Sequence, residues 1–329
     1  MDKIKEIFNQ KDSSDLKTFL GMSKTVYAFY HPDTKKVVDK LTENYPHFLF
    51  EDAWTGKQEE LDNLFFESWF KLNKNTLMGD IDEFKYRYPI NGSSEGIRHT
   101  ISLLDKNKNT IHTLEGEYEG YKAYADVYGI ELITHNPNKI FEYDFKNGDV
   151  LYLSNPNALN GNKLNLYHDL MKILSNKFPF VKVYLDLAYV NLVGDWNINI
   201  SYPVIDTIFF SLSKTYGVYY HRIGGMISKS QHNGLWGNKW FKNVFSIYLG
   251  IKLMKNQSIY SATKLEQERI FNIVKKKTEL INCDLKKSDV PLLLYSKETN
   301  NVNINNMFNR IKGTNRYCIS PLLYKDKIE

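Results

Sequence analysis

The feature that most constrains the fold is an alternation of short apolar runs with amphipathic segments, roughly between residues 90 and 230. Runs such as TIHTL (110–114), VKVYLDL (181–187) and TIFFSLS (207–213) are typical of buried strands. The segments 119–129 and 163–178, which lie between such runs, repeat their apolar residues at helical spacing. Strands that alternate with helices are joined by right-handed crossovers and form a mainly parallel sheet. The pattern therefore predicts an α/β domain with helices on both faces of the sheet.

Two regions of different character flank this central part. Residues 1–75 are polar and helical in pattern, whereas residues 239–329 hold a long helical region, a strand at 290–296, a short helix and a last strand at 316–320. Because domains usually contain 50–250 residues, we expect a large domain over 76–238 and a small α+β domain over 239–329. The N-terminal segment is expected to join the small domain or a dimer contact.

Composition excludes several classes of protein. The chain is 42% hydrophobic and 25% charged, as in globular proteins. The net charge is only +5 over 329 residues and the basic residues are scattered, so the charge gives no reason to expect a nucleic-acid partner. The most apolar helical stretch, 244–254, is too short to cross a membrane. The N-terminus lacks a signal-peptide pattern, and the two cysteines form neither a disulfide framework nor a metal-ligand spacing, so we expect a cytoplasmic protein without a metal site.

Ligands of parallel α/β sheets bind at the carboxyl ends of the strands, so polar residues after each strand are the candidates for a site. Gly92, Ser93 and Ser94 open a helix, and backbone N–H groups at such a position can bind an anion. Asp186 lies at the end of the run 181–187, where a buried carboxylate needs a partner such as a protonated ring nitrogen. Taken singly, these residues also fit an ordinary helix cap and an exposed strand-end aspartate.

A third cluster follows the run 207–213. Burial of Lys214 would lower its pKa and make it a better Schiff-base nucleophile. Ser211, Ser213 and Arg222 stand close enough in sequence to hold a phosphate together. Alone, this cluster is more typical of an ordinary surface lysine after a strand than of a functional site.

Taken together, the order of these residues resembles the fold type I pyridoxal-phosphate enzymes of the aminotransferase class I/II superfamily. The resemblance covers about residues 85–230. The corresponding motifs are a glycine-rich loop (92–96), an aromatic residue (Tyr118), an Asn-Pro segment (155–161), Asp-x-Ala-Tyr (186–189), and Ser-x-Ser-Lys (211–214) with Arg222 eight residues after the lysine. The resemblance implies a fold type I transferase that uses pyridoxal 5'-phosphate.

The resemblance also implies a role for each residue. Lys214 would form the Schiff base with the cofactor and move the proton at the substrate α-carbon, while Asp186 would pair with the pyridinium nitrogen. Tyr189 would bind the ring hydroxyl. Tyr118 would stack on the ring, although a core aromatic at a helix start is the alternative reading. The phosphate would be held by Gly92, Ser93, Ser94, Ser211, Ser213 and Arg222.

The chain departs from the family pattern at two places. Residues 155–161 read NPNALNG, which puts Ala158 where the family has a second asparagine that binds the ring hydroxyl. The contact with the ring hydroxyl is therefore either lost or made by Asn157, which we include among the cofactor-binding residues, or by Asn155. Tyr220 stands where many members carry glycine. The cofactor signature is therefore better supported than transamination.

Substrate recognition rests on fewer residues. Arg316 stands where many family members place an arginine that binds the substrate carboxylate, with a structural ion pair as the alternative. Arg310, six residues earlier, is predicted to be a solvated charge on the short helix. Trp54 fits either an aromatic residue contributed across a dimer interface or a core tryptophan.

The sequence thus predicts a homodimeric aminotransferase with a shared active site, acting on a small-molecule amino donor and acceptor. A decarboxylase or lyase on the same fold is the first alternative, because small shifts in the pocket decide which bond breaks. The second alternative is a non-catalytic ligand-binding protein, against which the presence of Lys214, Asp186, Tyr189 and Arg222 argues. No nucleic-acid, membrane or metal partner is expected.

Overall fold

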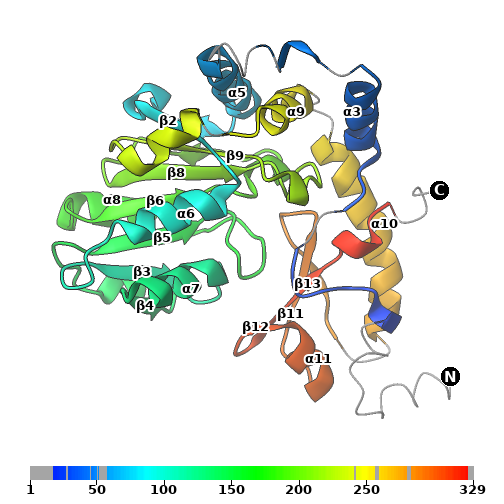
Figure 1. The fold of residues 1–329 in the computed structure, drawn as a ribbon. Helices are drawn as coiled ribbons and strands as arrows, with labels where there is room; N and C mark the ends of the chain where they lie inside the picture. The colour runs from blue at the N-terminus through cyan, green and yellow to red at the C-terminus, as the bar shows by residue number, and fades with distance from the viewer. Residues whose placement is uncertain are drawn as a thin grey trace.

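The computed structural model describes residues 18–26, 29–44, 46–49, 51, 58–240, 242–255, 259–279 and 283–324 (Figure 1). A seven-stranded sheet forms the centre of this fold. Its spatial order is β2 (Tyr86–Ile90), β9 (Gly224–Ser228), β8 (Ile205–Ser211), β6 (Lys182–Asp186), β5 (Val150–Ser154), β3 (Thr110–Leu114) and β4 (Glu131–His135).

The pairings in this sheet confirm the predicted mainly parallel α/β fold. From β8 to β4 all neighbouring strands are parallel, whereas β9 runs antiparallel to both β8 and β2. The connection from β8 to β9 contains a short 3-10 helix, Tyr219–His221, in place of a crossover α-helix. A chain that turns back without a crossover can only pair antiparallel, which explains the one reversed strand.

Helices cover both faces of the sheet, and the central strands β5 and β8 are therefore buried along their whole length. Helices α6 (Ser93–Ser102) and α7 (Glu119–Tyr128) share one hydrophobic cluster with Tyr152, Tyr184 and Phe209. The opposite face packs against α5 (Gln58–Asn73), α8 (Tyr167–Lys177) and α9 (Val244–Met254). On that face the ring of Trp69 in α5 stacks on Phe210 of β8, with centroids 4.1 Å apart.

A second, antiparallel sheet lies beside the first and is built mainly from the C-terminal part of the chain (Figure 1). Its spatial order is β10 (Lys286–Lys287), β11 (Leu293–Lys297), β13 (Thr314–Cys318) and β12 (Asn309–Ile311). Helices α10 (Ile259–Glu279) and α11 (Val302–Phe308) complete this part. The N-terminal residues Leu20, Met22 and Val26 belong to its core, and Ser23 forms an isolated antiparallel bridge to Cys318.

The flanking regions are therefore divided between the two sheets. In the predicted N-terminal segment 1–75, residues 20–26 pack with the second sheet whereas α5 packs on the first. The predicted long helical region after residue 238 consists of two helices, and the first of them, α9, also packs on the large sheet. Apolar side chains explain this division, because Phe65 and Trp69 of α5 and Leu249 of α9 are fully buried there.

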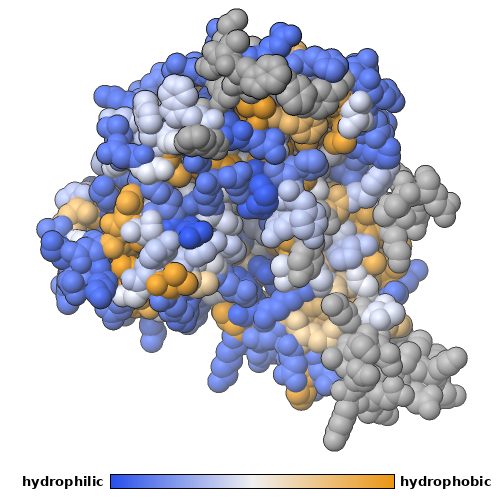
Figure 2. Space-filling model, in the orientation of Figure 1, coloured by the Kyte–Doolittle hydropathy of each residue, from blue (hydrophilic) through white to orange (hydrophobic). Residues whose placement is uncertain are grey.

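The remaining elements are smaller. Helix α3 spans Pro32–Glu43, and β1 (Leu77–Met78) pairs in parallel with β7 (Ile198–Asn199). Hydrophilic residues cover most of the face shown in Figure 2, with hydrophobic residues in separate small groups. None of the helices in the described residues combines the length and the apolar character needed to cross a membrane.

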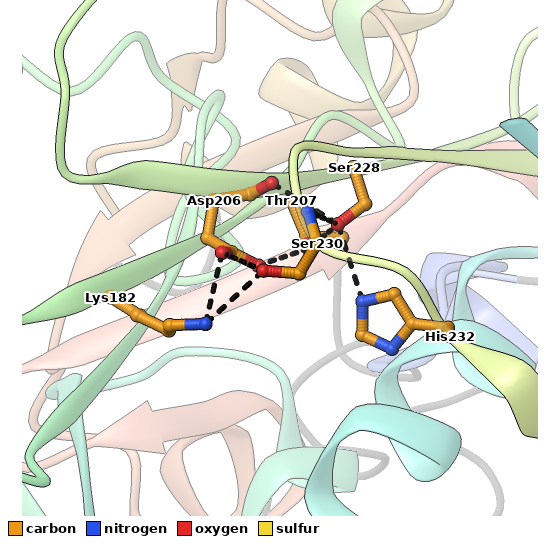
Figure 3. Close-up of polar contacts among 6 residues, drawn as sticks. All are labelled: Lys182, Asp206, Thr207, Ser228, Ser230 and His232. Atoms are coloured by element: carbon orange, nitrogen blue, oxygen red, sulfur yellow. Dashed lines mark hydrogen bonds and ion pairs between the residues drawn. The ribbon is translucent and has the colours of Figure 1, made fainter. Parts of the chain in front are cut away.

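A buried polar network joins three strands at the edge opposite the carboxyl ends of the parallel strands (Figure 3). Asp206 at the start of β8 accepts hydrogen bonds from Ser230 Oγ (2.5 Å) and Thr207 Oγ1 (2.9 Å), and it pairs with Lys182 of β6 at 3.1 Å. Ser228 Oγ of β9 lies 3.2 Å from His232 Nε2 and 2.8 Å from Thr207 Oγ1. The network fixes β6, β8 and β9 relative to one another.

We expect Asp206→Asn to destabilise the protein by about 1–3 kcal/mol at neutral pH, because it weakens charge-assisted hydrogen bonds in a buried site. Burial raises the pKa of Asp206, but the Ser230 hydroxyl and the Lys182 ammonium outweigh burial and hold it below its usual range. Its stabilisation is thus complete above pH ~4, the unfolded value, and is lost as the pH falls through the lower folded value. Urea unfolding at several pH values measures this. An Asp206→Asn protein no less stable at neutral pH than the exposed control Asp144→Asn would contradict it.

Candidate active site

A cavity of about 250 Å³ opens at the carboxyl edge of the parallel strands, where the two sheets meet. Residues from both sheets and from the N-terminal segment line it, so that motifs distant in sequence face one space. Among the predicted site residues, the cavity wall contains Ser93, Ser94, Tyr118, Asp186, Tyr189, Ser211, Ser213, Lys214, Arg222 and Arg316.

Asp186 is the last residue of β6 and is 5% exposed. Its Oδ1 accepts a hydrogen bond from the Ala188 N–H at 3.0 Å. Burial raises the pKa of Asp186 to about 7, although the Ala188 N–H and the charge of Lys214 oppose the rise. A cationic hydrogen-bond donor bound in the cavity would stabilise the charged form of this carboxyl, which burial disfavours.

Lys214 follows β8 and reaches the same cavity from the neighbouring strand. Its Nζ donates to the Val26 carbonyl at 2.8 Å and lies 4.8 Å from the centre of the Tyr219 ring. Burial lowers the pKa of Lys214 to about 8, with Arg222 and Arg316 also lowering it and Cys318 and Asp186 opposing the change. The amine is therefore neutral, and nucleophilic, in a larger fraction of molecules at neutral pH than a surface lysine.

The start of α6 and Arg222 form an anion cradle at one end of the cavity. Gly92 caps the helix with a φ of +77°, and a Cβ built on it would lie 2.6 Å from Arg222 Nη2. Only glycine fits both this backbone conformation and this close approach. Arg222 donates to the Asn91 carbonyl at 2.8 Å, and the buried Ser213 Oγ has no hydrogen-bond partner among the described residues. Free helix N–H groups, a guanidinium and an unpartnered hydroxyl together suit a phosphate.

Two tyrosines line the space between the cradle and Asp186. Tyr118 precedes α7, and its Oη lies 3.1 Å from Ser94 Oγ. Its ring meets that of Tyr121 edge-on at 5.5 Å. Burial raises the pKa of Tyr189 to about 12, with Arg316 opposing the rise, so its hydroxyl stays neutral and can donate a hydrogen bond.

Arg316 lies on β13 with 6% of its surface exposed. Its guanidinium donates to the backbone carbonyls of Lys24, at 3.0 Å, and Ala158. In the part of the chain that the structure describes, no carboxylate pairs with Arg316 and its Nε has no hydrogen-bond partner. The positive charge is therefore held at the cavity by neutral groups, which fits an anionic ligand better than a structural ion pair.

Asn157 is a predicted site residue that does not line the cavity. Its Oδ1 accepts from Asn160 N at 3.0 Å, and its Nδ2 donates to the Asn162 carbonyl at 2.7 Å. The side-chain amide therefore closes its own loop and does not replace the family asparagine. The alternative, Asn155, accepts from Leu164 N at 3.0 Å through its side-chain oxygen.

Arg310 corrects a further expectation. It was predicted on the surface of a helix, but α11 ends at Phe308 and Arg310 lies on β12. Its side chain lines the cavity, donates from Nε to the Gly116 carbonyl at 3.1 Å and pairs with Glu119. No local sequence signal marks this, because burial here comes from the contact between the two sheets.

Other residues of the site were missed for the same reason. Tyr219, whose ring lies beside Lys214 and 5.2 Å from the Arg222 guanidinium, carries no motif. Ser154 and Lys24 also line the cavity without a recognisable pattern. Trp54, the candidate for a contact across a dimer interface, lies outside the described residues.

The sequence matches no family model and no curated protein. Solved structures do match. A pyridoxal-phosphate-bound C-S lyase from Staphylococcus hominis superposes with a TM-score of 0.66 at 12% identity, over 95% of this chain and 90% of that one. Histidinol-phosphate aminotransferase from Sinorhizobium meliloti, in complex with pyridoxal-5'-phosphate, gives 0.64 at 12% identity, over 94% and 90%. L-threonine-O-3-phosphate decarboxylase from Porphyromonas gingivalis gives 0.61 at 15% identity, over 90% and 93%.

These similarities confirm the fold, which is that of the fold type I pyridoxal-phosphate-dependent enzymes. The neighbours agree with the resemblance that the order of the motifs indicated. They carry out three different reactions, so the shared fold does not choose among them.

The raised pKa of Asp186 gives a prediction that needs no ligand. A carboxyl whose pKa is about 7 when folded and about 4 when unfolded favours folding while protonated, and this contribution is lost as the pH rises through about 7. The cofactor-free Asp186→Asn protein should therefore be more stable than wild type near pH ~9, on the order of 2–4 kcal/mol, with a smaller difference near pH ~5. Denaturant unfolding at both pH values checks this. If the stability difference between Asp186→Asn and wild type does not grow with pH, burial does not raise the pKa of Asp186.

Proposed function

We propose that this protein is a pyridoxal-phosphate-dependent aminotransferase that acts on an amino acid or an amine-bearing metabolite, with Lys214 as the attachment point of the cofactor. One observation carries the proposal: a buried lysine of lowered pKa and a buried aspartate of raised pKa share a cavity with an anion cradle. Three of the chemical requirements of this cofactor, an amine, a partner for a ring nitrogen and a phosphate site, are thus met in one place.

The cavity contains polar groups that lack partners within the described part of the chain and that match groups of the cofactor. The unpartnered Ser213 Oγ and the close approach of Gly92 to Arg222 suit its phosphate. Asp186 suits a protonated ring nitrogen, and the neutral Tyr189 hydroxyl suits a ring oxygen. Bound in the cavity, pyridoxal phosphate would supply an electron sink for negative charge developing at the substrate α-carbon.

The chain's own side chains would then divide the work. Lys214 would take the proton from the substrate α-carbon and deliver it to the cofactor carbon C4′, for which a pKa of about 8 is well matched to neutral pH. Asp186 holds a proton at the ring nitrogen. Tyr189 donates a hydrogen bond at the ring oxygen, a contact that Ala158 cannot make.

Substrate binding would depend on Arg316. Its guanidinium is fixed at the cavity by two backbone carbonyls, so it is oriented before a substrate arrives. A planar guanidinium binds a carboxylate at two points, which favours an amino acid as the substrate.

Decarboxylation or elimination on the same scaffold is the second candidate. It stays a candidate because Ala158 replaces the family asparagine and the Asn157 amide is bound within its own loop, so the cofactor contacts differ from the family pattern. In a screen of amino acids, a keto acid formed only when an amino acceptor is present and becomes aminated indicates transamination. Carbon dioxide release indicates decarboxylation, and a keto acid formed with ammonia in the absence of an acceptor indicates elimination. The absence of any product with bound cofactor favours the non-catalytic alternative. A homodimer with a shared active site and a cytoplasmic location stay predictions.

The attachment point can be tested by chemical trapping. After reduction with borohydride in the presence of pyridoxal phosphate, mass spectrometry should find the adduct on the peptide with Lys214. Lys214→Ala should abolish it, because no other amine is held at the same point of the cavity. Lys24→Ala, which removes the other lysine that lines the cavity among the described residues, is the matched control and should keep the adduct. An adduct on a different lysine in the wild-type protein would refute the assignment.

Substitutions of Arg316 and Arg222 should have different effects, one on substrate binding and the other on cofactor binding. Arg316→Lys should raise KM for an amino acid about tenfold, because loss of the two-point contact costs about 1–3 kcal/mol. Its cofactor content should stay unchanged, whereas Arg222→Lys should lower cofactor content. Steady-state kinetics and cofactor absorbance measure both effects. Loss of cofactor from Arg316→Lys would mean that the two roles are exchanged, and an unchanged KM would mean that the substrate lacks an α-carboxylate.

A further inference from the structure

A second buried carboxyl, Glu117, lies beside the proposed site and has no part in the function described so far. It stands between β3 and α7 with 7% of its surface exposed. Its Oε1 accepts from the backbone N–H of Ser154 at 3.2 Å, and its Oε2 accepts from the Ser154 hydroxyl. Both carboxyl oxygens of Glu117 are therefore hydrogen-bonded to Ser154.

Ser154 connects Glu117 to the base of the cavity. It is the last residue of β5, it lines the cavity, and in the parallel β5–β6 pairing it is the direct partner of Asp186. The next residue continues the connection, since Asn155 N donates to the Asp186 carbonyl at 3.1 Å. Glu117, Ser154 and Asp186 thus follow one another along the carboxyl edge of β3, β5 and β6.

The groups around Glu117 determine the charge that it can carry. Asp186 faces it from β6, Tyr118 from the position just before α7, Tyr121 from α7, and Arg310 from β12. Burial raises the pKa of Glu117 to about 7, opposed by the Ser154 hydroxyl and N–H and reinforced by Asp186. Arg310 donates to the Glu117 backbone carbonyl, and no positively charged side chain forms an ion pair with the Glu117 carboxyl among the described residues.

Asp186 has its own set of charged and titratable neighbours. Lys214 faces it from the end of β8, and Tyr118, Tyr121 and Tyr189 lie near it. Of these, only Lys214 carries a positive charge. Asp186 raises the pKa of Glu117. Because repulsion between two carboxylates is reciprocal, a negative charge on Glu117 disfavours the charged form of Asp186 in turn.

We propose that Glu117 is a positioning residue which, through Ser154, keeps a proton at the Asp186 end of the cavity up to a higher pH than Asp186 would hold it alone. The role rests on the proposed function, in which Asp186 holds a proton at the ring nitrogen of the cofactor. A second negative charge near that nitrogen stabilises its protonated form. Glu117 thereby extends to higher pH the range in which the electron sink operates.

The test measures the titration of Asp186 in the cofactor-free, full-length chain. The melting temperatures of wild type and Asp186→Asn are measured from about pH 5 to about pH 9. The difference between them changes with pH, and the midpoint of that change is the pH at which Asp186 loses its proton. The same comparison in the Glu117→Gln background should give a midpoint lower by about one pH unit. Glu115→Gln is the matched control, because it removes a carboxylate two residues earlier in the chain. Among the hydrogen bonds of the described residues, the Glu115 carboxylate binds only the exposed Asn136 side chain, so the midpoint should not move. An equal midpoint in the Glu117→Gln and wild-type backgrounds overturns the proposal.

Ser154→Ala keeps the test decisive if Glu117→Gln does not fold. Without the hydroxyl donor, Glu117 keeps its own proton to higher pH and carries less charge, so the Asp186 midpoint should again fall. A midpoint that stays in place in this background overturns the proposal as well.

A second readout separates this inference from the proposed function. If the chain binds pyridoxal phosphate, the pH midpoint of its visible absorbance should be lower in Glu117→Gln than in wild type or Glu115→Gln. Normal cofactor binding with unmoved midpoints would refute the role of Glu117 and leave the proposed function standing. Failure to bind the cofactor, with the Asp186 midpoint still shifted in the unfolding experiment, would refute the proposed function and leave the coupling of the two carboxyls standing.

Discussion

The site depends on the burial of Lys214 and Asp186 in one cavity without an ion pair between them. Removing an ionisable group from water disfavours its charged form, so burial lowers the pKa of the lysine to about 8 and raises that of the aspartate to about 7. Both groups thereby titrate near neutral pH, where proton transfer is easiest to drive in either direction. The free-energy cost of keeping them buried has to be met by packing elsewhere in the fold.

That packing comes from the two strands that carry these residues. β6 and β8 are central strands with hydrophobic clusters on both faces, and the stacking of Trp69 on Phe210 fixes β8 just before the turn to Lys214. At the opposite edge, the network around Asp206 holds the same two strands in register (Figure 3). The second sheet closes the cavity with Arg310 and Arg316, and the Val26 carbonyl fixes the amine of Lys214.

The sequence predicts those parts of this arrangement that depend on local pattern. Asp186 and Lys214 end apolar runs, and Gly92 precedes a helix, so the parallel-sheet rule alone places them at one edge, where the structure has them. The break between α9 and α10, the reversed strand β9 and the packing of α5 on the large sheet were not predicted. Each depends on contacts between segments distant in sequence, which periodicity does not report.

The same distinction explains the errors within the site. Asn157 was expected at the cavity because of its position in a motif, but backbone groups of its own loop satisfy its amide. Arg310 was expected in solvent as a charge on the short helix, yet the helix ends at Phe308 and the Arg310 side chain pairs with Glu119 of α7. Glu117 carries no sequence signal, since an acidic residue after a strand is ordinarily exposed. Its burial follows from the position of Ser154 on the neighbouring strand.

The central claim is that the cavity at the carboxyl edge of the large sheet binds pyridoxal phosphate through Lys214. A crystal structure of the full chain, grown with pyridoxal phosphate, tests it most directly. The account predicts electron density continuous with Lys214 Nζ, with the phosphate against Gly92, Ser93 and Arg222 and the ring nitrogen at Asp186. An empty cavity at saturating cofactor, or cofactor bound with its phosphate at Arg316, would contradict it.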